Sequence, residues 1–193
     1  MGAKSKVCTI RNRPSPLEYG EAVRRLLVSV SPPVWSRALA MLEACRRGRR
    51  NLFLCGNGGS AANANHLATD LIYGVGLRGN RPFAAHSLSS NPSVLTCLGN
   101  DTGYAQTFSG QLRALARPGD VLVAFSGSGN SPNVVQALRT ARKIRVKSIA
   151  FLGFSGGACR RLADLVIHFP VNDMQLAEDL HMITAHLLFR HLR

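Results

Sequence analysis

The sequence predicts an α/β fold, in which a five-stranded parallel sheet is covered by helices on both faces, as in a Rossmann-like three-layer sandwich. Three observations favour this fold. Short apolar runs alternate with longer runs whose apolar residues recur at helical spacing. The short runs are mainly apolar and do not alternate strictly with polar residues, which is typical of parallel strands buried on both faces. The chain has 193 residues, of which 46% are hydrophobic, and this suits one domain with a sizeable core.

The chain is expected to begin with helices rather than with the sheet. Residues 1–14 are polar, basic and aperiodic and are predicted to form a flexible arm, so that a single domain occupies 15–193. A first helix starts at Ser15-Pro16, and a second follows the break at 31–33 and stops at Gly48. The residues expected to share the apolar faces are Leu17, Val23, Leu26 and Leu27 in the first helix and Val34, Trp35, Ala38, Leu39, Leu42 and Cys45 in the second.

Strands and helices then alternate to the end of the chain, and no linker, repeat or low-complexity segment divides them. The predicted strands are 51–55, 83–88, 121–125, 147–152 and 165–169. The predicted helices are 60–72, 92–98, 104–116, 132–144, a short one near 157–162, and 174–192.

Two glycine-rich segments, 56–60 (GNGGS) and 126–131 (SGSGNS), are the most informative part of the sequence. Each joins a predicted strand to a predicted helix, where backbone N–H groups and hydroxyls can converge on an anion at the positive end of the helix. In a parallel sheet, ligands bind outside the carboxyl ends of the strands, and both segments lie there. Neither segment has the spacing of a Walker A motif or of a dinucleotide fingerprint. The pattern therefore favours a small phosphorylated metabolite, and no nucleotide cofactor is expected.

The formal net charge of +14 would attract polyanions such as nucleic acid. The basic residues are spread along the chain, however, and the few aromatic residues do not interleave with them. Nucleic acid is therefore not expected as a partner, and an anionic substrate is the preferred explanation of the charge.

The sequence predicts neither a membrane span nor a secretory signal. No apolar run approaches the ~20 residues that a membrane helix needs, and no apolar stretch follows the basic N-terminus. The cysteines are odd in number and lack zinc-ligand spacing, which indicates reduced thiols in the core of a cytoplasmic protein. They are Cys8, Cys45, Cys55, Cys97 and Cys159.

Titratable residues gather in two of the predicted helices. His66 and Asp70 are four residues apart and project from one helix face, either as a solvated pair or, because they follow a candidate phosphate site, as reacting groups. The last helix is so apolar that it must be largely buried, and buried acids need partners. It carries Glu178, Asp179, His181, His186 and His191; the helix dipole accounts for the last of these, and the role of His181 stays open.

Four features in combination resemble the phosphoheptose isomerase group of the sugar isomerase (SIS) domain proteins. They are the segments 56–71, 99–108 and 124–138 and a closing helix with a glutamate eight residues before a histidine, and the resemblance runs from about residue 15 to the end. It implies an aldose–ketose isomerase that converts sedoheptulose 7-phosphate to D-glycero-D-manno-heptose 7-phosphate through an enediol, for nucleotide-activated heptose synthesis. It also implies a cytoplasmic homotetramer with sites between subunits, and zinc, one ion per subunit, as the candidate cofactor.

The resemblance assigns roles to the matching positions of this chain. Asp70 stands where the family has its catalytic glutamate, and His186 where it has its catalytic histidine. The metal-ligand positions are His66, Asp70, Glu178 and His186. The substrate-binding positions are Asn57, Gly58, Gly59, Ser60, Asn100, Asp101, Ser126, Gly127, Ser128, Ser131 and Glu178, with the serines as the phosphate cradle.

Three positions depart from the family pattern. Asp70 is one methylene shorter than the glutamate, Gly127 replaces a threonine, and Glu178 replaces a glutamine and so adds a negative charge. A carboxylate base and an imidazole acid still suit proton transfer through an enediol. The rival function is a non-catalytic sugar-phosphate-binding regulator of the replication-initiator-associating type, whose members share the fold but lack the acid and the distal histidine. Asp70 and His186 favour the enzyme.

Overall fold

The computed structural model describes residues 13–193. Its sheet has five parallel strands, as predicted, and their order is β2-β1-β3-β4-β5. The strands are β1 (Asn51–Cys55), β2 (Ala84–Ser87), β3 (Val121–Ser126), β4 (Lys147–Leu152) and β5 (Leu165–His168). The strand order reverses between β1 and β3, so these two strands lie side by side although 65 residues separate the end of β1 from the start of β3. An open parallel sheet binds ligands at such a reversal.

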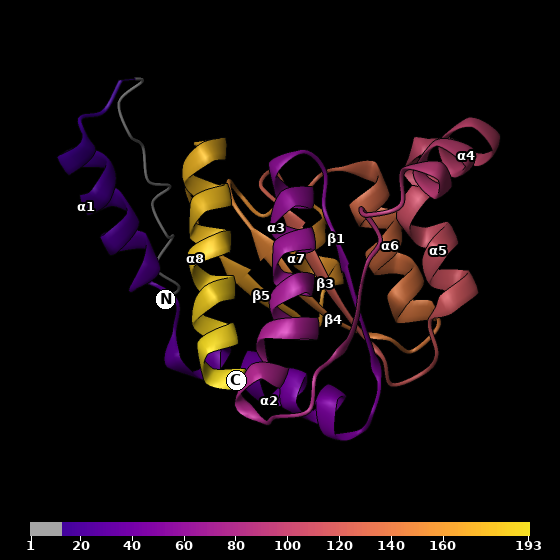
Figure 1. Ribbon diagram of the computed structural model, residues 1–193. Helices are drawn as coiled ribbons and strands as arrows, with labels where there is room; N and C mark the ends of the chain where they lie inside the picture. The colour runs from indigo at the N-terminus through magenta and orange to yellow at the C-terminus, as the bar shows by residue number, and fades with distance from the viewer. Residues whose placement is uncertain (1–12) are drawn as a thin grey trace.

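Helices cover both faces of the sheet, which confirms the three-layer architecture (Figure 1). Side chains along each strand alternate between two buried clusters; in β1, Leu52 and Leu54 join one cluster and Phe53 and Cys55 the other. The first cluster lies under α1 (Pro16–Leu27), α2 (Pro32–Arg47), α3 (Gly59–Thr69) and α8 (Met174–Leu192). The second lies under α4 (Pro92–Thr102), α5 (Thr107–Leu115), α6 (Pro132–Lys143) and α7 (Cys159–Leu162).

Helix α3 does not continue to residue 72 as an α-helix. It ends at Thr69 and widens into the π turn η1 (Asp70–Gly74), in which Val75 N–H donates to the Asp70 carbonyl at 3.1 Å. A Cβ on Gly74 would lie 2.8 Å from the ring of Phe189, so the glycine lets α8 pack closely against this turn. A short 3-10 turn, η2 (Gly76–Arg78), follows.

Three other expectations need correction. Helix α4 runs to Thr102, so Asn100 and Asp101 lie in its last turns and not in a loop after a short helix, and the 3-10 turn η3 (Tyr104–Gln106) precedes α5. Leu17 is 83% exposed, because α1 turns only Ala22 and Leu26 fully inward. Cys97 is an exposed thiol, whereas Cys45, Cys55 and Cys159 are free and buried as expected. Cys8 and residues 1–12 of the predicted arm lie outside the described residues.

No helix in 13–193 is long and apolar enough to cross a membrane. The longest, α8, is instead packed on the sheet. His181 of α8 is fully buried among Phe125, Phe151 and Phe169, with ring centroids 5.9–6.1 Å apart. Burial lowers the pKa of His181 to about 4, so its imidazole is neutral at physiological pH.

Candidate active site

The two glycine-rich segments line one cavity of about 250 Å³ at the carboxyl ends of β1 and β3. Helix α3 begins beside the first segment and α6 beside the second, so two helix N-termini face the same space. The lining residues are Asn57, Gly58, Gly59, Ser60, Phe125, Ser126, Gly127, Ser128, Ser131, Met174 and Glu178. The fold thus brings together nine of the eleven residues expected to bind substrate.

The second segment is held in shape by its own hydroxyls. Ser126 Oγ accepts a hydrogen bond from Gly129 N–H at 3.1 Å, and Ser128 Oγ accepts one from Asn130 N–H at 3.2 Å. Gly129 has φ +69°, and a Cβ there would overlap the Gly156 carbonyl, so only glycine fits this bend. Ser131 is the N-cap residue of α6, and its hydroxyl makes no capping bond, which leaves it available to a ligand in the cavity.

Glu178 reaches this cavity from α8. Its carboxylate lies 3.4 Å from Ser60 Oγ, which donates to it, and its backbone carbonyl accepts from Asn63 Nδ2 at 2.9 Å. A Cβ on Gly59 would overlap the carboxylate, so the glycine makes room for Glu178. A carboxylate repels a phosphate, so Glu178 is suited to an uncharged, hydroxyl-bearing part of a ligand in this cavity.

A polar network that the sequence did not reveal holds Asn57. Its side-chain amide and that of Asn133 exchange two hydrogen bonds of 2.8 Å, and Tyr104 Oη donates to Asn57 Oδ1 at 2.9 Å. Asn133 is fully buried and also donates to Thr107 Oγ1 at 3.3 Å. The only available signal was a polar Asn133 among the apolar residues of α6, and a single sequence does not show what such a residue contacts.

The second group of site residues lies farther along α3. Asp70 Oδ2 lies 3.5 Å from His66 Nε2 and 3.9 Å from His186 Nε2, and the two imidazole nitrogens are 2.9 Å apart. The histidine side chains are about half exposed, at 50% and 47%, and that of Asp70 is 22% exposed. The three side chains therefore form an open cluster that a ligand can approach.

The cluster fits a metal ion. The three ligand atoms lie within 4.8 Å of one another. Ligands at about 2.0–2.1 Å from a tetrahedral zinc are about 3.3 Å from each other, close to the three distances found. Two imidazoles and a carboxylate also form a donor set that zinc accepts, with a fourth position open.

Two predicted groupings are not brought together within this chain. Glu178 lies two helical turns from His186 on α8, about 12 Å along the axis, and faces the glycine-rich cavity instead of the metal cluster. Asn100 and Asp101 bond to each other at 2.8 Å on the exposed end of α4 and do not line the cavity.

The comparisons with known proteins address the same region. The family model described as the SIS domain matches residues 18–153. The phosphoheptose isomerase of Pelobacter propionicus is 40% identical over 173 residues, covering 89% of this chain and 90% of the relative. That of Rhodospirillum rubrum is 41% identical over 156 residues, covering 81% and 82%. The chain belongs to the phosphoheptose isomerase family of SIS-domain proteins.

Solved structures of the family have the same fold. The phosphoheptose isomerase of Neisseria gonorrhoeae superposes with a TM-score of 0.83 at 30% identity, covering 91% of this chain and 95% of that one. The one from Francisella tularensis gives 0.85 at 26% identity, covering 91% and 93%. The sugar isomerase domain of a Sphaerobacter thermophilus transcription factor gives 0.66 at 21% identity, which shows a shared fold only.

Proposed function

We propose that this protein is an aldose–ketose isomerase that converts sedoheptulose 7-phosphate to D-glycero-D-manno-heptose 7-phosphate, for nucleotide-activated heptose synthesis. Membership of the phosphoheptose isomerase family supports this assignment. The observation that carries it is the Asp70 carboxylate beside two imidazoles. A base and an acid at one position are what an enediol reaction needs and what a regulator that only binds sugar phosphate does not need.

In the proposed reaction, the Asp70 carboxylate removes a proton from C1 of the ketose. The electrons of that C–H bond form the C1=C2 bond of the enediol, while the O2 oxygen gains a proton from His186. Proton return to C2 and loss of the O1 proton then give the aldose. Zinc, if bound, would be held by His66 Nε2, Asp70 Oδ2 and His186 Nε2 and would stabilise the negative charge of the enediolate; the protons would then move through Asp70 Oδ1 and His186 Nδ1.

The phosphate end of the substrate is assigned to the cavity between the glycine-rich segments. Ser60, Ser126, Ser128 and Ser131 and the backbone of the two bends would hold the phosphate, and Glu178 would accept from a sugar hydroxyl. Asn57, fixed by Asn133 and Tyr104, would orient the sugar.

The length of the substrate supports a site that is shared between two copies of the chain. Ser60 and Asp70 are ten residues apart, about 15 Å along the helical segment. A seven-carbon phosphate with C–C bonds of about 1.5 Å spans about 10 Å when extended. We therefore propose a homotetramer in which the cavity of one subunit, with Glu178, lies opposite the His66–Asp70–His186 cluster of another subunit. In this arrangement Asn100 and Asp101 of a neighbouring subunit can also reach the substrate.

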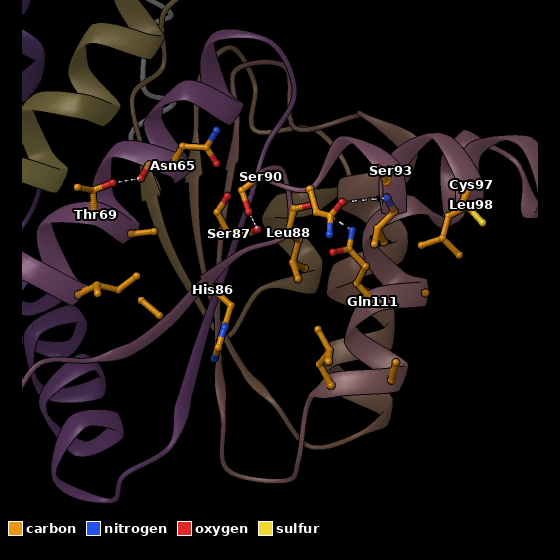
Figure 2. Close-up of a pocket in the computed structure, with 18 residues that line it drawn as sticks. Asn65, Thr69, His86, Ser87, Leu88, Ser90, Ser93, Cys97, Leu98 and Gln111 are labelled. Atoms are coloured by element: carbon orange, nitrogen blue, oxygen red, sulfur yellow. Dashed lines mark hydrogen bonds between the residues drawn. The ribbon is translucent and has the colours of Figure 1, made fainter.

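An open groove on the edge of the sheet supports such an assembly. It measures about 1150 Å³ and lies between α3, the edge strand β2 and helices α4 and α5 (Figure 2). Leu88, Val94, Leu98 and Leu115 contribute to a mainly apolar lining, and His86 and Gln111 are among the polar residues.

Sedimentation should give about four times the monomer mass of 20.8 kDa, and Leu115→Glu should dissociate the assembly. A monomer at tens of micromolar would contradict the shared site.

The activity is tested by incubating the protein with sedoheptulose 7-phosphate and measuring aldose 7-phosphate, with and without zinc. Turnover in either condition supports the assignment. No turnover in both, with sugar-phosphate binding retained, would favour the regulator.

Zinc is tested separately by calorimetry: His66→Ala should weaken zinc binding by 10-fold or more, whereas His86→Ala should not.

The sugar-phosphate substrate and the four free cysteines described fit a cytoplasmic protein.

A further inference from the structure

The loops that enter the strands carry much of the positive charge of the protein. In a parallel sheet the amino ends of neighbouring strands lie together: Asn51 is in register with Ala84, and Val121 with both Leu52 and Lys147. The segments before β2, β1, β3 and β4 therefore follow one another along one edge, called here the amino edge. The basic residues are far apart along the chain, which argues against a nucleic-acid surface in the sequence alone. Folding brings them together on this edge.

The loops of the amino edge contact one another. A Cβ on Gly119 would lie 3.4 Å from Arg50 Nε, so the Arg50 side chain covers the loop that leads to β3. Gly119 N–H in turn donates to the Arg145 carbonyl at 3.0 Å, and Lys147 N–H donates to the Asp120 carbonyl at 2.9 Å. These contacts join the basic loops before β1, β3 and β4 into a continuous surface.

Arginines surround a hollow at the β2 end of this edge. The hollow has a volume of about 230 Å³ and is lined by Arg46, Arg49, Arg50 and Arg81 together with residues 82–84. Arg46 is paired with Glu43 at 2.7 Å. Within 13–193, no ion pair is described for the other three arginines. Three guanidinium groups around one concave surface, none with an ion pair described, favour an anionic ligand.

The charge exceeds what the helix ends require. The amino edge has two acidic residues, Glu43 and Asp120, and Asp164, before β5, lies beside it; all three are occupied by arginines or by backbone N–H groups. Its ten basic residues are Arg46, Arg47, Arg49, Arg50, Arg81, Arg117, Arg142, Lys143, Arg145 and Lys147. With all three acids counted, the net +7 is half of the formal +14 of the whole chain. Helices α2, α5, α6 and α8 end here, the last with its Leu192 carbonyl 2.9 Å from Arg46 Nη1, and each dipole accounts for only about half a charge.

Two of these arginines occupy strained backbone positions. Arg49 has φ +53° after α2, and Arg145 has φ +61° after α6. Glycine is the usual residue at such a helix end, and a residue with a side chain costs about 1–2 kcal/mol in this conformation. The chain thus keeps a cation at both places where glycine would relieve strain, which points to a use for the charge.

We propose that the amino edge binds the phosphate backbone of a nucleic-acid duplex. The edge extends over three strand spacings, about 14 Å, and a duplex presents about eight negative charges over that length. Phe83, the aromatic ring at the hollow, is only 4% exposed, so the surface offers phosphate contacts without base stacking. Binding is therefore independent of sequence, and it leaves the candidate active site, at the opposite ends of the strands, accessible.

The test measures binding of a fluorescein-labelled 24-base-pair duplex by anisotropy between 50 and 200 mM salt. Arg49→Gly with Arg81→Ala removes two charges from the hollow while relieving strain at residue 49. This pair should lower affinity about 10-fold or more and reduce the log–log salt slope by about 2. The matched control, Arg160→Ala with Arg161→Ala on α7, removes the same charge and should keep the wild-type slope.

Four outcomes would overturn the proposal. The first is no duplex binding at 100 mM salt. The second is an equal loss in both variant pairs, which would reflect net charge alone. The third is a more than 10-fold preference between two unrelated duplex sequences. The fourth is tighter binding of pyrophosphate, or of vesicles containing phosphatidylglycerol, than of the duplex at the same salt concentration.

Discussion

Asp70 lies where α3 gives way to the π turn η1, and the wider turn changes the direction in which the chain continues. The carboxylate lies within 4 Å of two histidine nitrogens, one on its own helix and one on α8. An aspartate has a shorter reach than the glutamate expected at this position. The open, half-exposed surroundings of the cluster allow the substrate to approach the carboxylate instead.

Asp70→Asn should abolish turnover, with kcat reduced about 10²–10⁴-fold, because an amide cannot accept the C1 proton. Affinity for sedoheptulose 7-phosphate should change little, since the proposed phosphate site is the separate cavity between the glycine-rich segments. Steady-state kinetics and calorimetry of the same preparations measure the two effects. The matched control is Asp179→Asn, which removes a carboxylate that bonds to Tyr19 and lies outside the site. Wild-type kcat in Asp70→Asn would remove Asp70 from the base role.

Ser128→Ala with Ser131→Ala should raise KM about 10-fold or more while kcat stays within a few-fold of wild type. Each hydroxyl bond to a charged phosphate contributes about 1.5–3 kcal/mol. Ser155→Ala, on a different loop outside the cavity, is the control. An unaltered KM in the double variant would mean that the phosphate binds elsewhere.

At the scale of single residues, local spacing predicted some partners and not others. The pairing of His66 with Asp70 follows from four residues of helix. The exchange of hydrogen bonds between Asn57 and Asn133 depends on two strands becoming neighbours, and nothing in the local sequence specifies it.

Helix α8 contributes to both groups of site residues, because Glu178 near its start reaches the cavity and His186 two turns later lies in the cluster with His66 and Asp70. Between them, His181 is fixed in the core without a hydrogen-bond partner for either ring nitrogen in the described structure. The phenylalanine rings around it exclude water, so the helix is anchored by a residue that resists protonation.

Protein stability should therefore fall as pH decreases from about 6.5 to 4. In this window an unfolded chain protonates His181, whereas the folded chain, with a pKa of about 4, does not. The unfolded state binds more protons, so acidification favours it by up to about 3 kcal/mol. Burial also lowers the pKa of His168 and adds to the effect in the same direction.

Urea denaturation at pH 7 and pH 4.5 measures this difference. His181→Phe, which keeps an aromatic ring in an aromatic environment, should lose less stability between the two pH values than wild type. His191→Gln, at the exposed end of α8, should behave as wild type. An unchanged pH dependence in His181→Phe would show that this histidine does not titrate differently on folding.

At the scale of elements, continuous apolar runs were sufficient to predict all five strands within two residues. Helix ends were less predictable. The π turn at Asp70 depends on the contact between Gly74 and Phe189, and the extension of α4 to Thr102 depends on where the chain turns toward η3. Both are set by distant parts of the chain.

For the whole molecule, the parallel sheet places the two proposed functions at opposite ends of its strands. The carboxyl ends of β1 and β3 bring the glycine-rich segments into one cavity, and the amino ends gather the arginines. The sequence predicted the first convergence, because each glycine-rich segment carries its own signal. It did not predict the second, because only the strand order shows that basic residues from separate loops become neighbours.

The proposed function requires that this chain moves a carbonyl between two adjacent carbons by proton transfer through an enediol. Proton NMR of sedoheptulose 7-phosphate incubated with the wild-type protein in D₂O detects that transfer. We expect an aldose 7-phosphate that carries deuterium at C2, and no deuterium in carbon positions when Asp70→Asn replaces the wild-type protein. Absence of aldose and of carbon-bound deuterium with the wild-type protein, both with zinc and without it, would rule out this reaction.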